Sequence, residues 1–523
     1  MTRAKQRPAR AERPHALTVT ARVIETELKF QIPAASRQAL HKAVATASAV
    51  TTRLQAVYAD TPARDLAAAG LALRLRKEGR VWVQTLKGRG DGLMQRLEHE
   101  VPLPPQAGVP VLDATRHAGT PAGDKLLALL QSLQQKHGDS DGVGAALQPI
   151  YRTDIRRLHR RVRHQGALIE VAYDRGHLIA GEQRAVVDEI EFELIRGPGS
   201  ALVDLAQRWA RRFCLWWDVR TKSERGYRLA LGLADVPAVK SLPALLPAGS
   251  TPAQALSQML GSALSQALPN AAEMASGTAA PEHLHQLRVA LRRLRTALRV
   301  FAAWAPDPAA ALALEAAWRE PFGLLGAARD SDVIATTLRP ALAAAGAPTL
   351  PRAMSPGGVS PEDLVADVVR GATFNSLLLQ TLALCSTPPA PTTDAASRLQ
   401  PQAVIQPLWR RVRRAVPGFA QASVEDQHRL RKRIKRLRYA LEAVRPMLKR
   451  QAGERFLRAL RRALGALGEL NDLQVADTLY RQLALQEPQA WFAVGYLSAR
   501  RLAVRDTAAA ALARLRKLKP AWK

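Results

Sequence analysis

The sequence predicts a chain of two unlike parts: an α+β N-terminal part built on an antiparallel β-barrel, and an all-α C-terminal helical bundle with an internal pseudo-twofold repeat. Three observations support this prediction. Short segments that alternate apolar and polar residues recur from about residue 22 to 232. After residues 233–250, which are rich in Pro and Ala, the apolar spacing becomes helical. Within the helical half, two stretches of sequence match each other.

The length of the chain indicates how many parts it has. Its 523 residues exceed what one ordinary core holds, and a hydrophobic content of 47% indicates globular domains rather than disorder. We expect a disordered basic arm at 1–21, a barrel domain at 22–232, a linker at 233–250, and a helical domain at 251–523 with repeats at about 251–345 and 400–523.

The alternating segments of the first half have the pattern of strands in an antiparallel sheet or barrel. Examples are VIETELKFQI (23–32), GLALRLRK (70–77) and AVVDEIEFELI (185–195), and turns that contain Gly separate them. Two further segments, SRQALHKAVATA (36–47) and ALVDLAQRWARRFCLWW (201–217), have helical spacing. We therefore expect helices on the outside of the sheet.

Most of these strands carry charged residues on one face. In residues 24–30, the side chains of Glu25, Glu27 and Lys29 alternate with uncharged ones, and period-2 geometry puts them on one face. The same alternation recurs for Arg74 and Arg76, for Arg96, Glu98 and Glu100, for Glu170 and Asp174, and for Glu189, Glu191 and Glu193. An ordinary small barrel is filled by apolar side chains, so this pattern needs another explanation.

Two explanations fit a charged strand face. The face can simply be solvated, because most alternating charge in proteins lies at the surface. That explanation predicts Lys, Glu, Thr and Gln in interchangeable positions, whereas Glu is concentrated on the first and late strands and Arg and Lys on the middle ones. Carboxylates suit a hard divalent cation, while Arg and Lys suit phosphate. A closed barrel with this lining would be a metal–phosphate tunnel.

The helical half contains the internal repeat. HQLRVALRRLRTALRVF (285–301) matches HRLRKRIKRLRYALEAV (428–444), and LLGAARDSDV (324–333) matches ALGELNDLQV (466–475). The two matches come in the same order and at nearly the same separation along the chain. We therefore predict a duplicated helical unit.

Each copy of the repeat carries basic residues at helical spacing beside a stripe of Leu and Ile that would form core. We call these the two basic stripes: His285, Arg288, Arg292 and Arg295, and His428, Arg431, Lys435 and Arg438. Each could be the solvated face of an ordinary amphipathic helix. Duplication favours another arrangement, in which the stripes meet and an anion offsets their crowded charge. The histidines would be phosphate donors or helix-packing residues.

The net charge of the chain also indicates a polyanionic partner. There are 76 Lys and Arg against 45 Asp and Glu, giving +31. Nucleic acid is not expected, because only 5% of residues are aromatic and no nucleic-acid-binding motif is visible. A membrane partner is not expected either, because no apolar run approaches the length of a membrane span. A linear phosphate polymer fits best, and no oligomeric state is predicted.

Cysteine content and the N-terminal segment indicate a cytoplasmic protein. The two cysteines, Cys214 and Cys385, are far apart in sequence, so we expect neither a disulfide framework nor a cysteine-rich zinc site. The N-terminal arm is basic but lacks the apolar core of a secretory signal.

The motifs described above resemble two known domain families. ETELKF (25–30) is followed by a long supporting pattern at 57–90, by EIEFEL and by TKSERGY, and together they resemble the CYTH domain of the triphosphate tunnel metalloenzymes over roughly 22–232. The helical half, with its repeated H-x-L-R segments at His285 and His428, resembles the CHAD domain from about residue 250 to the end. The resemblance implies an inorganic triphosphatase joined to a polyphosphate-binding helical module.

The resemblance also implies roles for individual residues. Divalent Mg²⁺ or Mn²⁺ would be bound by Glu25, Glu27, Glu189 and Glu191, with Asp174 or Glu170 as a further ligand. Triphosphate oxygens would be held by Lys29, Arg74, Arg76, Lys87, Arg156 and Lys222, with Arg96 and Arg152 as weaker candidates. Catalysis would depend on Glu25, Glu27, Lys29 and Lys87. Adjacent strand residues face opposite ways, so the alternative of Arg157 in place of Arg156 stays open.

The predicted function is metal-dependent hydrolysis of inorganic triphosphate or short polyphosphate, with a helical domain that binds longer polyphosphate. One alternative is another enzyme on the same tunnel: an adenylate cyclase, or a thiamine or nucleoside triphosphatase. The other is a non-catalytic protein that binds polyphosphate or targets granules. The inward carboxylates argue against the second alternative, since pure anion binding gains nothing from them. The predicted location is the cytoplasm, with association with polyphosphate granules as an extension.

Overall fold

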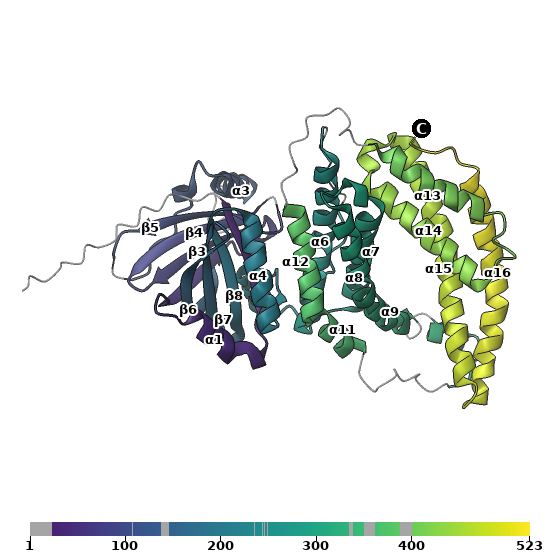
Figure 1. The fold of residues 1–523 in the computed structure, drawn as a ribbon. Helices are drawn as coiled ribbons and strands as arrows, with labels where there is room; N and C mark the ends of the chain where they lie inside the picture. The colour runs from purple at the N-terminus through teal and green to yellow at the C-terminus, as the bar shows by residue number, and fades with distance from the viewer. Residues whose placement is uncertain are drawn as a thin grey trace, which may run out of the picture. The chain divides into compact units, whose positions relative to one another are not determined.

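A computed structural model of the chain provides the structure (Figure 1). It describes residues 24–522 except 91, 107, 138–145, 235, 243, 245, 248, 334–337, 350–360 and 387–399, and for 327–333, 361 and 362 it describes the backbone alone. The predicted basic arm at 1–21 lies outside the described residues.

Among its described residues, the N-terminal part contains nine strands: β1 (Ile24–Gln31), β2 (Val50–Asp60), β3 (Leu71–Glu78), β4 (Val81–Arg89), β5 (Gln95–Leu103), β6 (Gln148–His164), β7 (Ala167–Ala180), β8 (Gln183–Arg196) and β9 (Trp216–Trp217). Their order in the sheet is β5-β4-β3-β2-β6-β7-β8-β1-β9, and eight of them form a closed antiparallel barrel. The predicted barrel is therefore confirmed.

Five helices accompany the strands: α1 (Arg37–Val44), α2 (Asp65–Ala68), α3 (Pro121–His137), α4 (Gly199–Phe213) and α5 (Lys222–Leu231). Short 3₁₀ helices lie at Ala34–Ser36 and Ala114–His117. Helix α4 is amphipathic, and its apolar face packs on the outer face of β7 and β8, as the prediction of helices outside the sheet requires.

Alternation along the strands separates apolar from charged side chains. Leu28 and Phe30 of β1 are buried in the same core as Phe192 of β8 and Leu202 of α4. The residues between them, such as Lys29, point to the opposite face of the strand. Burial of the apolar face under α4 thus directs the charged residues toward the inside of the barrel.

The inward face of the later strands changes from charged to apolar along its length. Ile155 lies on the same strand face as Arg157, Leu178 on that of Asp174, and Val187 on that of Glu189. These three apolar side chains cluster with Leu54 of β2. We call this cluster the apolar plug.

The described chain divides into two compact units. The first contains α2, α3, β3, β4 and β5, and the second contains α1, β7, β8, β9 and all helices from α4 onward, while β1, β2 and β6 are divided between them. The contacts below are described within one unit or the other.

The C-terminal part is helical, as predicted. Its helices are α6 (Pro252–Ser276), α7 (Pro281–Val300), α8 (Pro308–Ala317), α9 (Arg319–Val333), α10 (Arg339–Ala344), α11 (Pro361–Arg370), α12 (Ala372–Ser386), α13 (Pro401–Ala415), α14 (Val424–Ala443), α15 (Arg450–Leu483) and α16 (Trp491–Arg516). Short 3₁₀ helices lie at Ala302–Trp304, Arg445–Met447 and Pro488–Ala490.

The internal repeat is visible in helix boundaries. Helices α7 and α14 are each 20 residues long, and His285 and His428 are the fifth residue of their helix. Helix α14 begins after the N-cap Ser423, whose hydroxyl accepts the backbone N–H of Asp426. The two copies therefore place their basic stripes at the same height on equivalent helices.

Within the described residues, no single helix is both long and apolar enough to cross a membrane. The bent pair Asp363–Arg370 and Ala372–Ser386 passes that test only when the two helices are taken together, by length and composition.

Candidate functional site

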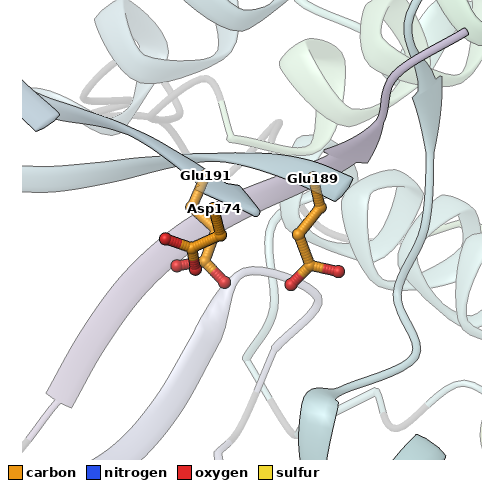
Figure 2. Close-up of side chains that lie close together, drawn as sticks. All are labelled: Asp174, Glu189 and Glu191. Carbon is orange, nitrogen blue, oxygen red and sulfur yellow. The ribbon is translucent and has the colours of Figure 1, made fainter. Parts of the chain in front are cut away.

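Three carboxylates converge on the inner face of β7 and β8 (Figure 2). Asp174 of β7 lies opposite Glu189 of β8 in the strand register, and Glu191 is two residues further along β8. One oxygen from each carboxylate lies within 4.8 Å of the other two. We call these residues the acidic cluster. It arises because period-2 alternation puts Glu189 and Glu191 on one face, next to the antiparallel partner strand that supplies Asp174.

The ammonium group of Lys222 lies in the middle of the acidic cluster. Its Nζ is 2.8 Å from Asp174 Oδ2, 2.6 Å from Glu189 Oε1 and 2.6 Å from Glu191 Oε1. Lys222 is the first residue of α5, and the Thr221–Glu224 capping box fixes where that helix begins. Burial alone would lower the pKa of Lys222, but the three carboxylates outweigh it and hold the pKa well above its usual value.

Two arginines complete the neutralisation of the cluster. Arg157 of β6 donates two hydrogen bonds to Asp174, at 2.7 and 2.8 Å, and Arg225 of α5 donates to Glu189 Oε2 at 2.9 Å. Burial raises the pKa of each carboxylate of the cluster, yet the neighbouring Arg and Lys groups lower it further, and the net pKa shift is downward for all three. The cluster is therefore ionised at neutral pH.

Strand β1 contributes polar groups to the same unit. Lys29 lies 3.8 Å from Glu189 and donates a hydrogen bond to the backbone carbonyl of Arg220. Gln31 donates to Glu189 Oε2 and to Asp218 Oδ2, each at 3.1 Å. Glu27 is opposite Glu193 in the pairing of β1 with β8. The alternation predicted for 24–30 is confirmed, since Lys29 and Gln31 share the face of the acidic cluster.

The acidic cluster has the donor chemistry of a divalent metal site. Mg²⁺ and Mn²⁺ bind carboxylate oxygens, and three lie within reach of one point here. Glu189 Oε1 is buried and forms an ion pair with Lys222 but no hydrogen bond of good geometry, so it keeps a lone pair for a cation. The Lys222 ammonium stands in for a cation in this arrangement. These residues fit a divalent cation that shares the site with Lys222 or displaces it.

A second charged set lies on β3, β4 and β5, in the other compact unit. Lys87 Nζ is 2.8 Å from Glu25 Oε2 and 3.0 Å from Glu98 Oε1. Further along these strands, Arg76 Nη2 is 2.8 Å from Glu100 Oε1, and Arg74 donates to the hydroxyl of Tyr58 at 3.0 Å. Each phosphate-binding candidate of this set is paired with a carboxylate or a hydroxyl of its own unit.

Glu25 differs from the acidic cluster in the direction of its pKa shift. Burial raises the pKa of Glu25, and the repulsion from Glu98 adds to that effect, while Lys87 lowers the pKa only in part. Glu25 is not among the carboxylates that group as a metal site in the described residues, and neither is Glu27. Their predicted role as metal ligands stays a prediction.

The structure also locates the weaker phosphate-binding candidates. Arg96 is half-buried on the strand face that carries Glu98, whereas Arg152 and Arg156 are exposed. The residue of β6 that faces the acidic cluster is Arg157, which is opposite Asp174 in the register. Arg157 is the alternative that the sequence leaves open. Alternation alone cannot select it, because the register between β6 and β7 determines which arginine faces the acidic cluster.

Several residues that contact the charged groups of one unit or the other were not predicted from the sequence. They include Arg225 of α5, Gln31 of β1, Tyr58 of β2 and His159 of β6, whose Nδ1 is 3.4 Å from Glu170. Gln31 continues the Glu25–Glu27–Lys29 alternation, which is a signal that could have identified it. The position of Arg225, one helical turn after Lys222, is a similar signal.

The basic stripes of α7 and α14 crowd like charges. Burial and the nearby guanidinium groups of Arg292, Arg431 and Arg288 lower the pKa of Lys435 to about 6, although Asp472 acts in the opposite direction. Lys435 belongs to α14, while Arg288 and Arg292 belong to α7, so the two stripes lie near each other as the repeat predicted. His428 Nδ1 is 2.9 Å from Asn471 Oδ1.

Other stripe residues have partners of their own. The guanidinium groups of Arg288, Arg292 and Arg295 all lie over the ring of Phe322, at 5.3, 5.3 and 5.0 Å from its centroid. Arg295 also forms a 2.7 Å ion pair with buried Glu315. In the second stripe, Arg438 lies 3.4 Å from Glu442. The last arginine of each stripe therefore lies beside a carboxylate, Glu315 in the first copy and Glu442 in the second.

Known proteins resemble both parts of the chain. The family model described as the CYTH domain matches residues 23–226, and the family model described as the CHAD domain matches residues 258–481. The inorganic triphosphatase of Haemophilus influenzae is 33% identical over 175 residues, which are 33% of this chain and 44% of that relative. The chain thus spans less than half the length of this curated relative.

Solved structures also match. The CHAD domain from the plant Ricinus communis is 27% identical, covers 55% of this chain and 98% of its own, and gives a TM-score of 0.43. A putative adenylyl cyclase from Hippeastrum, described as having a dominant triphosphatase activity, is 19% identical, covers 39% of this chain and 95% of its own, and gives a TM-score of 0.26.

Proposed function

The chain joins a CYTH domain to a CHAD domain, and from this premise we propose that it is a divalent-metal-dependent hydrolase of inorganic triphosphate or short polyphosphate. The observation that carries the proposal is the acidic cluster, in which three ionised carboxylates lie within 4.8 Å of one another among lysine and arginine groups. The inorganic triphosphatase that the chain resembles over 175 residues supports the choice of reaction.

The charges of the barrel residues suit phosphoryl transfer. This reaction depends on in-line positioning and on neutralising the negative charge of the transferred group. A divalent cation bound by Asp174, Glu189 and Glu191 would supply Lewis-acid activation and part of that neutralisation. Lys222 and Arg157 would then exchange carboxylate partners for phosphate oxygens. Both are already desolvated, so the exchange would require little reorganisation.

The predicted catalytic residues have separable roles in this proposal. Lys29, beside the acidic cluster, would orient the phosphate that is attacked. Lys87 would bind phosphate in place of Glu25 and Glu98. The raised pKa of Glu25 would make its carboxyl group a better proton acceptor than an ordinary glutamate. Glu27 would act as a further metal ligand.

We also propose that the helical domain binds longer polyphosphate through the two basic stripes. The low pKa of Lys435 supports this role. Burial and the repulsion from three arginines both disfavour its ammonium form, and a bound polyanion would offset them. A cytoplasmic location, and association with polyphosphate granules, belong to the same proposal.

One observation favours a second candidate function, a barrel that binds phosphate without turnover. Lys222 already neutralises the acidic cluster, with Nζ at 2.6 to 2.8 Å from all three carboxylates. If Lys222 keeps that position and excludes a cation, the basic residues can only hold an anion. Metal dependence of the reaction therefore separates the two functions.

The test is phosphate release from inorganic tripolyphosphate by the full chain, with and without Mg²⁺ or Mn²⁺, and with ATP and thiamine triphosphate in parallel. The proposal expects metal-dependent release from tripolyphosphate, far above the other substrates. Faster turnover of ATP or thiamine triphosphate would favour a nucleotide or thiamine enzyme. No turnover of any substrate, with phosphate binding intact, would favour the non-catalytic candidate.

A further inference from the structure

A buried carboxylate of the helical domain contacts two arginines of the barrel domain. Glu273 is the only charged residue of α6, and its side chain is 4% exposed. Its Oε1 is 2.7 Å from Nη1 of Arg228, which belongs to α5. Its Oε2 is 3.9 Å from Nη1 of Arg220 and accepts a hydrogen bond from the Thr278 hydroxyl at 2.7 Å. All of these residues lie in the second compact unit. A carboxylate this buried needs such partners to offset its desolvation.

The helical repeat itself does not require an acid at this place. Helix α6 directly precedes the stripe helix α7, as α13 directly precedes α14. Glu273 lies in the last turn of α6, whereas α13 contains no acidic residue and ends in VRRA (412–415). The carboxylate thus occurs in the copy of the repeat that contacts Arg220 and Arg228.

Arg220 connects α6 to the acidic cluster through Asp218. Its guanidinium group donates to both carboxylate oxygens of Asp218, at 2.9 and 2.8 Å, and to Ser276 Oγ of α6 at 2.6 Å. Asp218 is fully buried. The amide nitrogen of Gln31 donates to Asp218 Oδ2 and to Glu189 Oε2, each at 3.1 Å. One side-chain amide therefore joins this ion pair to a carboxylate of the acidic cluster.

Both lysines beside the acidic cluster depend on the same elements. Nζ of Lys29 donates to the backbone carbonyl of Arg220, so the position of that backbone helps to determine where the ammonium group lies. Lys222 is the first residue of α5, and Arg228 lies further along the same helix. The ion pair between Arg228 and Glu273 therefore holds the helix whose first residue enters the acidic cluster.

Arg220 also links α6 to the cluster electrostatically. Burial lowers the pKa of Arg220, but nearby carboxylates outweigh burial and raise the pKa above its usual value: those of Asp218, Glu273 and Glu189. Neutralising Glu273 would leave a desolvated guanidinium group with fewer counterions. Arg220 would then interact more strongly with the remaining carboxylates, Glu189 among them. A change in α6 is therefore expected to reach the site.

We propose that Glu273 is a positioning residue for the barrel site, acting through Arg220 and Arg228. It fixes the start of α5 and the backbone before it, and thereby the places of Lys29 and Lys222. The effect on hydrolysis rests on the proposed function, whereas the placement of the two lysines does not. The helical domain would then complete the barrel site in addition to binding a polymer.

The test is chemical labelling of lysines in the full chain, which needs neither metal nor turnover. Glu273→Gln is compared with a matched control, Asp477→Asn. Asp477 is another buried carboxylate of the helical domain, and it holds Arg481 and Arg501 at 2.9 and 3.2 Å. Each protein is treated briefly with acetic anhydride in EDTA, well below its unfolding temperature. Peptide mass spectrometry then measures the acetylation of each lysine.

We expect acetylation of Lys29 and Lys222 to rise by about threefold or more in E273Q. Both amines are largely buried and lie beside carboxylates that stabilise the unreactive ammonium form, so displacement exposes and deprotonates them. D477N should leave both unchanged, and Lys87, in the other compact unit, serves as the internal reference. Unchanged labelling of both lysines in E273Q, or an equal rise in D477N, would overturn the proposal.

A second variant, Arg228→Gln, removes the partner of Glu273 on α5 and should raise the labelling of Lys222 as well. The double variant E273Q/R228Q should label Lys222 no more than the more severe single variant, because both changes break one contact. Additive effects on Lys222 would show that Glu273 does not act through Arg228 and would contradict the proposal.

Hydrolysis of tripolyphosphate by the same variants tests the functional consequence. The value of kcat/KM should fall by about threefold or more in E273Q and R228Q, because misplaced lysines orient the phosphate less well. D477N should stay within about twofold of the wild type. Loss of folding stability alone would affect E273Q and D477N alike. Absence of hydrolysis in the wild type would refute the proposed function, and the labelling would still decide the role of Glu273.

Discussion

The acidic cluster of the barrel and the basic stripes of the helical domain both bury charge, but they stabilise it differently. In the barrel, opposite signs are interleaved, and the pKa of each carboxylate in the cluster shifts toward the charged form. In the stripes, like signs crowd together, and the pKa of Lys435 falls to about 6, toward the neutral form. The barrel cluster is thus surrounded by counterions, whereas Lys435 of the stripes lies among guanidinium groups that Asp472 offsets only in part. The proposed functions match this difference: exchange of partners in the barrel, and retention of a polyanion on the helices.

The largest expected effect is loss of turnover when the acidic cluster loses one charge. Glu189→Gln removes a carboxylate that contacts Lys222, Arg225 and Lys29. We expect tripolyphosphate hydrolysis to fall by a factor on the order of 10² to 10³, because the proposed metal ligand and a buried counterion are lost together. Initial rates of phosphate release at saturating metal measure the effect. Glu182→Gln, at the exposed turn between β7 and β8, is the control. Comparable rates in E189Q and E182Q would refute the metal assignment.

The next largest expected effect separates polyphosphate binding by the helical domain from hydrolysis in the barrel. Reversing Arg431, Lys435 and Arg438 to Glu should weaken binding of long-chain polyphosphate by roughly 10²-fold or more, since each phosphate contact contributes electrostatic affinity. Hydrolysis of tripolyphosphate should be spared. Retention of the full chain on a polyphosphate column and hydrolysis rates are measured together. The control reverses Lys432, Arg455 and Arg458, which are exposed. Equal retention of the wild type and the stripe variant would exclude this role for the stripe.

The pH dependence of polyphosphate binding tests whether Lys435 is neutral in the free protein. In the free protein, the pKa of about 6 leaves this amine mostly neutral above pH 6. A bound polyanion favours the ammonium form, so binding takes up a proton, and affinity should fall as pH rises above 6 by up to about tenfold per unit. Lys435→Met should bind more weakly at pH 6 and lose most of this slope. Titrations from pH 5.5 to 8 measure it. A slope that persists in K435M would assign the proton to another group.

The smallest effect compares two matched helix caps. Thr221 begins α5 beside the acidic cluster, and Thr251 begins α6 in the helical domain, each with a capping box. Either Thr→Ala change should lower the free energy of unfolding by about 1 kcal/mol. Only Thr221→Ala should also reduce hydrolysis, by a few-fold, because it loosens the position of Lys222. Denaturant unfolding and initial rates of both variants check this. Equal rates in T221A and T251A would show that Lys222 needs no such support.

Much of the barrel could be predicted because alternation is a local signal. The strand face on which Glu189 and Glu191 lie follows from period-2 alternation along β8, and that of Lys29 follows from alternation along β1. The choice between Arg156 and Arg157 does not, because it depends on the register of β6 against β7. The position of Lys222 within the acidic cluster depends on how α5 is placed by the closed fold, which no local pattern encodes.

In the helical half, the repeat identified both basic stripes because duplication leaves the same residues at the same height of two helices. It could not identify the surroundings of Arg293, because Leu242, whose backbone carbonyl accepts a hydrogen bond from Arg293, comes from outside the repeat. Asp330, the counterpart of Asp472, lies where the structure describes only the backbone.

The apolar plug has a consequence for the order in which a polymer could be consumed. Leu54, Ile155, Leu178 and Val187 fill the barrel interior beyond the charged residues of β6, β7 and β8. An interior closed on that side would have its opening at the charged end, so a phosphate chain would enter end first and would be shortened from its terminus.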